Sequence, residues 1–398
     1  MQDRCLKIGF IMTRYAGTDG VSLETRKWMD VLSESGHECF CFCGENDYLP
    51  GERVIVETKA HLDDDDNIAI NSSLFQRKSR SPDISGLIDS VKRELKERLS
   101  QFHNTFGIEL FIAENTLSLP MHIPLGLALT EYAAESGVPV VSHNHDFWWE
   151  RKRYVSSPAA DYIDASFPPS FPGMKHVVIN SVAGRQLSFR KGIGARLVPN
   201  VMDFNSGSNG ADDIDNEKKY TDDMHRELAI DPDCRVLLQP TRIVPRKRIE
   251  KAIELVRALE RKCVLLVTHE SGDEGEGYRR YLADFARKME VDVRFLADRF
   301  GFERGINQEG RKVYSLQDAY RFCDLVTYPS SIEGFGNAFL ETLYFKKPIV
   351  MSAYEIFRQD IEPKGFQIME LNDYITPDLV REVNTILDEP DKAHEWVE

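Results

Sequence analysis

The sequence lacks any apolar stretch that approaches the roughly 18 residues of a membrane-spanning helix. Its first patterned segment, Leu6 to Met12, reads directly as a strand, so we expect no signal peptide. It also lacks a disulfide framework, because its 7 cysteines are odd in number and irregularly spaced. We therefore expect a cytoplasmic protein whose thiols stay reduced.

Basic residues are too few to balance the acidic ones, and the formal net charge is -15. Since a nucleic-acid binder usually carries a basic face, we expect no nucleic-acid partner. The candidate for a helix that docks on anionic membranes, Val91 to Leu99, has mixed charges, which favours a solvated surface helix. We expect no stable membrane insertion, and the sequence does not indicate an oligomeric state.

Patterns that would predict a metal site are weak. The acidic run Asp63 to Asp66 ends no strand, which favours a solvated loop. His143 and His145 suggest zinc, but the sequence offers no evident third ligand. Thiols on one face of a flat strand cannot close a tetrahedron, so we interpret three of them as core residues: Cys39, Cys41 and Cys43. We predict no metal and no cofactor.

The chain does contain an alternation of strands and helices over its 398 residues, which predicts an α/β protein with parallel doubly wound sheets. Residues 45–82 are weakly patterned, and residues 204–222 are rich in Gly, Ser, Asn and Asp. We predict an N-terminal domain over residues 1–203, an interdomain excursion or linker over 204–230 and a C-terminal domain over 231–398.

One stretch, Ser330 to Leu343, combines a predicted strand end, a glycine turn and a helix start. The turn contains Gly334 and Gly336, which would let a ligand approach the backbone closely. Unpaired amides of a helix N-terminus bind phosphate well, and here they would belong to Asn337, Ala338 and Phe339. Carboxylates suited to sugar or ribose hydroxyls flank the turn at Glu333 and Glu341. A plain tight turn is the alternative reading.

A second stretch, Gln239 to Ile249, also follows a predicted strand and opens a predicted helix. It is cationic and includes Arg242 and Lys247. A cationic loop at a helix start is a second candidate anion site.

Together the two stretches resemble the signature of the retaining GT-B glycosyltransferases, especially family 4. Arg242 and Lys247 match the family's Arg and Lys with four residues between them. Glu333 and Glu341 match its two glutamates with seven residues between them. The resemblance implies two Rossmann-like domains that face each other across a cleft. It also implies a hinge at Pro199-Asn200.

The resemblance assigns a donor site. Glu341 would bind the ribose and Glu333 the donor sugar hydroxyls, while the backbone around Ala297 to Arg299 would hold the base. The glycine loop after the first strand, with Gly20 and less closely Gly17, would meet the diphosphate. The implied donor-binding residues are Gly20, Arg242, Lys247, Gly334, Phe335, Gly336, Asn337, Ala338, Phe339 and Glu341.

Acceptor residues are predicted at two strand ends of the N-terminal domain. Family 4 enzymes often place a His-Asp pair near the reacting sugar, which His145 and Asp146 match. Asn115 could touch the acceptor or cap the following helix, and Trp149, with Trp148, could be a sugar platform or be buried in the interdomain cleft. The implied acceptor-binding residues are Asn115, His145, Asp146, Trp149 and Arg151, with Glu150 as a further contact.

The implied reaction moves a hexosyl unit from a nucleotide-diphosphate sugar to a small polar acceptor: a sugar, a sugar phosphate or a glycerate-type compound. It would proceed with retention by a front-face mechanism and without metal, with His145, Arg242, Lys247 and Glu333 as catalytic residues. The alternatives are a nucleotide-sugar epimerase or hydrolase of the same fold, or a non-catalytic nucleotide-sugar-binding homologue. Pro377 to Leu387 predicts a last helix that Pro390 breaks, so we expect either a short crossover or a chain lacking the family's crossover helix.

Overall fold

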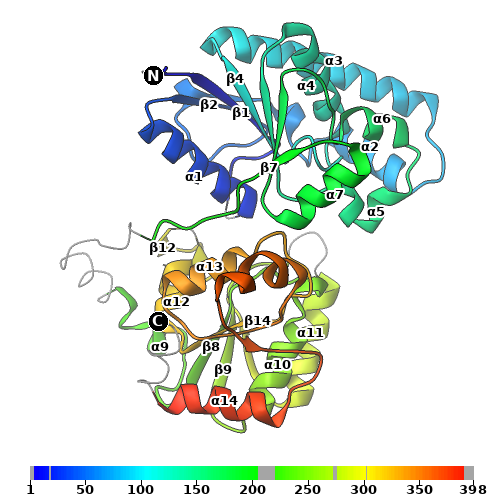
Figure 1. Ribbon diagram of the computed structural model, residues 1–398. Helices are drawn as coiled ribbons and strands as arrows, with labels where there is room; N and C mark the ends of the chain where they lie inside the picture. Colours follow the sequence, from blue (N-terminus) through cyan, green and yellow to red (C-terminus); the bar gives the residue numbers. More distant parts are fainter. Residues whose placement is uncertain (1–3, 18, 205–219, 272–275, 302, 390–398) are drawn as a thin grey trace. The chain divides into compact units, whose positions relative to one another are not determined.

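The computed structural model describes residues 4–17, 19–204, 220–271, 276–301 and 303–389 (Figure 1). The chain divides into two compact units, Met1–Pro199 and Asn200–Glu398, so the division falls within the Pro199-Asn200 pair. Much of the predicted linker and the residues after Glu389 lie outside the described residues. The described residues 220–230 include helix α9 (Met224–Glu227). Asp223, just before this helix, accepts a hydrogen bond from the ammonium of Lys312 at 2.9 Å.

The N-terminal unit contains a seven-stranded sheet with the order β3-β2-β1-β4-β5-β6-β7, and every strand pair is parallel. The order reverses between β1 and β4, which is where doubly wound sheets bind ligands. The strands are β1 (Lys7–Ile11), β2 (Glu38–Cys43), β3 (Val54–Val56), β4 (Leu110–Glu114), β5 (Val140–Asn144), β6 (Met174–Val178) and β7 (Ala195–Leu197). The helices are α1 (Gly20–Glu34), α2 (Asp65–Phe75), α3 (Pro82–Phe106), α4 (Ile123–Ser136), α5 (Lys152–Val155), α6 (Ala160–Ser166) and α7 (Ser181–Lys191).

Helices cover both faces of this sheet, as the period-two alternation of its strands requires. Helix α1 packs on one face, where Cys39, Cys41 and Cys43 are buried as predicted for core thiols. Helices α3 and α4 pack on the other face, against Phe40 and Phe42 of the same strand. All seven cysteines are free, and of these Cys5 is exposed and Cys234 half-buried.

Two predictions for this unit can be compared with the structure. The acidic run is a loop only in its first half: Asp63 lies in an exposed turn, whereas Asp64 caps helix α2 by accepting from the amide of Asp66 at 3.1 Å, and acidic residues are favoured in a first helical turn. The helix over Val91 to Leu99 is part of α3 and lies at the surface as predicted: its charged positions are exposed or half-buried, and its apolar positions face the core. Among the described residues, no helix is long and apolar enough to cross a membrane.

The C-terminal unit repeats the pattern with a six-stranded parallel sheet of order β10-β9-β8-β14-β15-β16. Its strands are β8 (Arg235–Gln239), β9 (Cys263–Val267), β10 (Asp292–Phe295), β14 (Leu325–Tyr328), β15 (Ile349–Met351) and β16 (Met369–Glu370). A small sheet joins β11 (Phe300–Gly301), β13 (Lys312–Ser315) and β12 (Gly305–Ile306). The helices besides α9 are α10 (Ile249–Ala258), α11 (Glu276–Met289), α12 (Leu316–Phe322), α13 (Asn337–Tyr344) and α14 (Pro377–Asp388).

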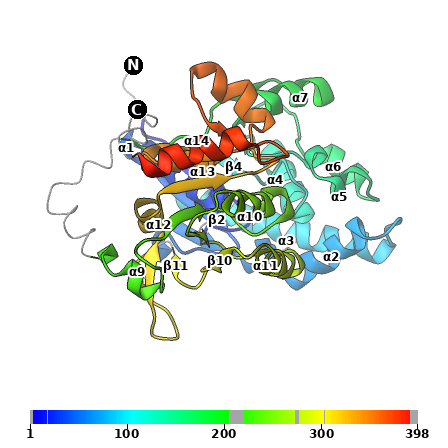
Figure 2. The ribbon, with the colours of Figure 1, turned by 90° about the horizontal axis from the view of Figure 1, so that it is seen from below.

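Helices α10, α11 and α14 share one hydrophobic core on one face of this sheet, and Figure 2 shows them side by side. Strands β8 and β14 are neighbours, so the segments that follow them leave the sheet at the same edge. Those segments are the two stretches singled out in the sequence.

Candidate functional site

A buried ion pair joins the two stretches in the C-terminal unit. Lys247 ends a 3-10 turn (Pro245–Lys247) after β8, and Glu333 follows β14. The ammonium of Lys247 bonds to Oε1 of Glu333, and these side chains are only 10% and 9% exposed. Nη1 of Arg246 lies 3.8 Å from the other carboxylate oxygen. The structure therefore brings together two residues that were predicted as catalytic.

Burial and the partner's charge have opposite effects on the pKa of each member of this pair. Burial acts to raise the pKa of Glu333, but the charge and hydrogen bond of Lys247 outweigh it and hold that pKa below its ordinary value. Burial lowers the pKa of Lys247, and Glu333 opposes the shift. Because both groups are stabilised in their charged forms by each other, the site holds an ion pair.

A third group, His269, was missed by the sequence analysis. It follows β9, the neighbour of β8, and its Nδ1 lies 3.0 Å from the hydroxyl of Thr268. Burial, with the charges of Lys247 and Arg242, lowers the pKa of His269 to about 4. The rule that ligands gather at the carboxyl ends of parallel strands could have indicated it. The charges of Lys247 and Arg242 therefore add to burial in disfavouring a protonated imidazole at this edge of the sheet.

The glycine turn is shaped by the protein itself. Gly336 has φ of 112°, and a Cβ there would lie 2.0 Å from the Tyr354 hydroxyl. That hydroxyl donates to the carbonyl of Phe335 at 2.7 Å. The absence of a side chain at Gly336 is therefore required by Tyr354 and by the backbone, besides any approach of a ligand.

The first turn of α13 differs in part from the prediction. The amide of Phe339 is not an unpaired donor, because it donates to the carbonyl of Gly336 at 2.9 Å. Asn337 begins the helix, and its side-chain oxygen accepts from the amide of Asn200 at 2.9 Å. Ala338, the next residue, is buried.

Other predicted donor residues take defined positions. Glu341 of α13 accepts from the hydroxyl of Tyr320 at 2.7 Å, and burial together with Glu341 raises the pKa of that tyrosine well above its ordinary value. Arg299 turns its side chain inward, where it donates to the carbonyls of Lys312 at 2.9 Å and Glu227 at 3.2 Å. Its backbone is also engaged, because its amide donates to the carbonyl of Leu296 at 2.9 Å and its carbonyl accepts from the amide of Tyr314 at 2.8 Å. A role of this loop in holding the base stays a prediction.

In the N-terminal unit, Asn115 organises the predicted acceptor residues. It follows β4 with φ of 53°, a left-handed conformation that asparagine tolerates. Its amide donates to Asp146 at 3.1 Å, and its side-chain oxygen accepts from the amide of His145 at 3.1 Å. Asp146 in turn accepts from Nε of Arg151 at 2.8 Å. Asn115 does not cap the following helix, because His122 caps α4.

The residues predicted as a sugar platform and as a glycine loop are already in contact with other groups of the protein. Trp149 stacks on Phe147 with ring centroids 4.5 Å apart, so one face of this proposed platform is covered. Glu150 accepts from the backbone amide of Phe147 at 2.8 Å. Gly20 is the first residue of α1, but Asp19 already caps that helix, accepting from the amides of Val21 and Ser22.

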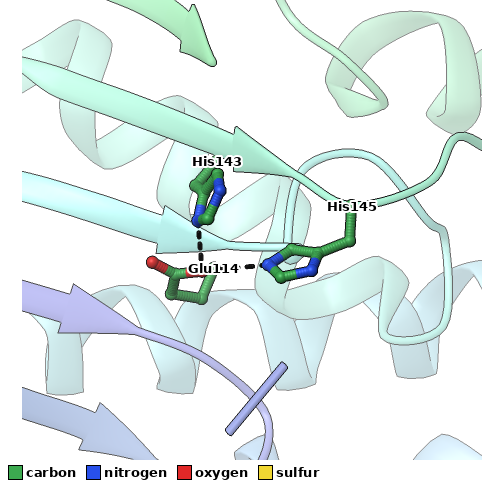
Figure 3. A group of neighbouring side chains, drawn as sticks. All are labelled: Glu114, His143 and His145. Carbon is green, nitrogen blue, oxygen red and sulfur yellow. Dashed lines mark hydrogen bonds and ion pairs between the residues drawn. The ribbon is translucent and has the colours of Figure 1, made fainter. Parts of the chain in front are cut away.

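A buried cluster stands at the ends of β4 and β5, where Glu114 pairs in register with His143 (Figure 3). Oε2 of Glu114 lies 2.9 Å from Nδ1 of His143 and 3.5 Å from Nε2 of His145. Burial acts to raise the pKa of Glu114, but the two imidazoles lower it to about 2. His143 also stacks on Trp28 of α1, with ring centroids 4.3 Å apart.

This cluster supplies the third ligand that the sequence did not reveal. The donor atoms of Glu114, His143 and His145 lie within 4.8 Å of one another, so the group could hold a metal ion. A tetrahedral zinc ion with ligands at about 2.1 Å would separate them by about 3.4 Å. The 2.9 Å between Glu114 and His143 is instead a hydrogen-bond length. Glu114 and His143 are therefore hydrogen-bonded to each other, and metal independence stays a prediction.

Two doubly wound sheets, one with clustered cations and one with a His-Asp pair at their carboxyl edges, have the architecture of the GT-B fold. A solved structure of WaaG, a glycosyltransferase involved in lipopolysaccharide biosynthesis, shares the fold with a TM-score of 0.61 at 13% identity, covering 98% of this chain and 93% of that one.

The family model described as glycosyl transferases group 1 matches residues 221–398. Mannosylglucosylglycerate synthase of Thermotoga maritima is 32% identical over 419 residues, covering 99% of this chain and 94% of the relative. The synthase of the same name from Petrotoga mobilis is 30% identical over 387 residues, covering 92% and 86%. The chain belongs to the glycosyl transferases group 1 and is a glycosyltransferase.

Proposed function

We propose that this enzyme transfers a mannosyl unit from a nucleotide-diphosphate sugar to glucosylglycerate or a closely similar small polar acceptor, with retention of configuration and without a metal ion. Two relatives that align with at least 92% of the chain are mannosylglucosylglycerate synthases, whose name describes a product built from mannose, glucose and glycerate. The predicted hexosyl donor and glycerate-type acceptor fall within this proposal.

The observation that carries the proposal is the buried Lys247–Glu333 pair, with Arg242 and His269 nearby at the same sheet edge. A departing nucleoside diphosphate gains negative charge, and fixed cations that meet this charge are usually the largest contribution to such catalysis. Lys247 would act as a point charge, whereas the guanidinium of Arg242 can bind two oxygens at once.

Glu333 would have two successive partners. Without donor it neutralises Lys247, which is too deeply buried to remain charged alone at low cost. When diphosphate oxygens contact Lys247, the carboxylate of Glu333 can accept hydrogen bonds from donor sugar hydroxyls. An exchange of this kind would tie recognition of the sugar to arrival of the diphosphate.

The acceptor is assigned to the N-terminal unit, where Asn115, Asp146 and Arg151 form one hydrogen-bonded network. Arg151 is the cation of this network and is 40% exposed, so it suits an acceptor that carries a carboxylate. For retention we propose a same-side displacement, in which an oxygen of the leaving diphosphate accepts the proton of the acceptor hydroxyl. The cations and the dipole of α13 would take the role that a metal ion has in other transferases.

The test begins with thermal-shift titration of UDP, GDP and ADP against the wild-type enzyme and an Arg242→Ala/Lys247→Ala variant. Binding at about 100 times the dissociation constant should add about 2.7 kcal/mol of stability. We expect one base to stabilise the wild type and none to stabilise the variant.

The mannose derivative of that nucleotide is then incubated with and without glucosylglycerate, and products are identified by mass spectrometry. Mannosylglucosylglycerate formed only with acceptor supports the proposal. Cleavage of the donor at the same rate with and without the acceptor would favour a hydrolase. Failure of all three nucleotides to bind a folded chain would overturn the donor site.

A further inference from the structure

Glu114 lies in an unusual position for a carboxylate that the proposed reaction does not use. It ends strand β4 and is fully buried, and one oxygen atom, Oε2, faces both His143 and His145. The two imidazoles favour its ionised form and lower its pKa to about 2, against the effect of burial. A buried charge of this kind is costly unless neighbouring groups pair with it and hydrogen-bond to it.

His143 fixes the carboxylate. Its Nδ1 donates to Oε2 at 2.9 Å, and its ring is held by the stack against Trp28, with an interplanar angle of 29°. His143 itself is fully buried. The first histidine of the His-Asn-His sequence is therefore an anchor, and the second is the one whose side chain is partly accessible, at 10%.

His145 turns one particular nitrogen toward the carboxylate. Its Nε2 faces Oε2 of Glu114, and its other ring nitrogen points away from the cluster (Figure 3). The tautomer of a histidine is set by the hydrogen bond that one of its nitrogens makes. At 3.5 Å the two atoms are in contact without a hydrogen bond, and Nε2 of His145 has no hydrogen-bond partner among the described residues. Catalytic hydrogen bonds often tighten only when substrate is present.

We propose that Glu114 is a positioning residue for His145: its carboxylate keeps a proton on Nε2 and so leaves Nδ1 as the ring nitrogen that meets the substrate. This inference rests on the proposed function only in taking His145 as the residue near the reacting sugar. A triad of this logic orients a histidine in many unrelated enzymes, with the carboxylate itself never reaching the substrate.

The variant that tests the role is Glu114→Gln, which keeps the size of the side chain and removes its charge. Glu109→Gln is the matched control, since Glu109 lies just before the opposite end of the same strand and pairs with Arg4. We expect Glu114→Gln to lower kcat by about 100-fold, the contribution of a well-placed histidine. We expect the dissociation constant of the nucleoside diphosphate to stay unchanged, and the control to match wild type in both.

A direct readout is the tautomer of His145, measured by long-range ¹⁵N–¹H spectra of enzyme labelled at its 10 histidines and assigned with His145→Gln. We expect Nε2 to be the protonated nitrogen in the wild type, and the two tautomers to mix in Glu114→Gln. The wild-type spectrum decides the matter even if the variant does not fold.

Three results would overturn the inference. One is a wild-type His145 protonated at Nδ1 alone. Another is a folded Glu114→Gln variant with wild-type kcat. The third is activity that a chelator removes and Zn²⁺ restores, which would make the cluster a metal site. Failure of the proposed function looks different, because then no nucleotide binds while the His145 spectrum is unaffected.

Discussion

The ammonium of Lys247 is paired with the carboxylate of Glu333 in a place where neither side chain is more than 10% exposed. The two residues follow neighbouring strands, β8 and β14, and are 86 positions apart in sequence. A pair formed over such a separation depends on the complete sheet, and it makes the donor site part of the folded core of its unit.

Replacing one member of this pair should therefore destabilise the protein. We expect Lys247→Met to lower the free energy of unfolding by about 3–5 kcal/mol, because it leaves Glu333 buried without its partner. Lys262→Met is the control: Lys262 is 70% exposed in its pair with Asp231, so the change should cost less than about 1 kcal/mol. Urea denaturation measures both. Additive effects of Lys247→Met and Glu333→Gln in the double variant would contradict the coupling.

The turn before α13 should not tolerate a methyl group at Gly336. Gly336→Ala adds backbone strain and an overlap with the Tyr354 hydroxyl at 2.0 Å, so we expect a loss of more than about 2 kcal/mol and weak nucleotide binding. Gly310→Ala shares the positive φ but meets nothing within 4 Å, so it reports the strain alone. Adding Tyr354→Phe should rescue part of the loss at Gly336. No rescue would mean that the overlap is not the cause.

Glu341 can be tested with altered ligands. If its carboxylate binds the ribose, Glu341→Gln should weaken the preferred nucleoside diphosphate roughly tenfold, which is about 1.4 kcal/mol. The amide oxygen can still accept from Tyr320, so the fold should persist. The 2′,3′-dideoxy nucleotide should bind both proteins equally in calorimetry. An equal loss for the two ligands would place Glu341 outside the ribose site.

His122 should make the N-terminal unit sensitive to acid. It caps α4 by accepting from the amide of Leu125, its other nitrogen donates to the carbonyl of Lys59, and burial lowers its pKa from 6.5 to about 4. The unfolded chain therefore takes up a proton first, and stability falls as pH drops from about 6.5 to about 4, by an amount on the order of 3 kcal/mol.

The measurement for His122 is urea unfolding at pH 7 and pH 5, followed by tryptophan fluorescence, since three of the 4 tryptophans lie in the N-terminal unit: Trp28, Trp148 and Trp149. His122→Asn keeps a capping side chain without a titrating group, so its stability should change less between these values of pH. Equal pH dependence in the two proteins would remove His122 as the cause.

Several features of the fold could be predicted from short stretches of sequence. The strand, glycine turn and helix around Glu333 are adjacent in the chain, and the spacing of Arg242 and Lys247 is fixed within one loop. Local patterns of this kind set where side chains leave a sheet, because parallel strands all end at one edge. The GT-B fold and the glycosyltransferase activity followed from them.

The side-chain neighbours that could not be predicted from the sequence depend on the order of the strands in the sheet. Glu114 and His143 are 29 residues apart and meet only because β4 lies beside β5 in register. His269 lies within the electrostatic influence of Lys247 for the same reason, because β9 lies beside β8. The acidic run was misjudged for a different cause, because the capping of α2 by Asp64 is local and could have been recognised from its position before an apolar segment.

The distribution of thiols makes site-specific labelling of the enzyme possible. Five cysteines are buried, and the two that are not, Cys5 and Cys234, belong to different units. Fluorophores or spin labels attached under native conditions should therefore enter one in each half of the enzyme, without engineered cysteines. The native chain thus carries its own pair of attachment points for following, in solution and in real time, whether the two halves move when a sugar nucleotide binds.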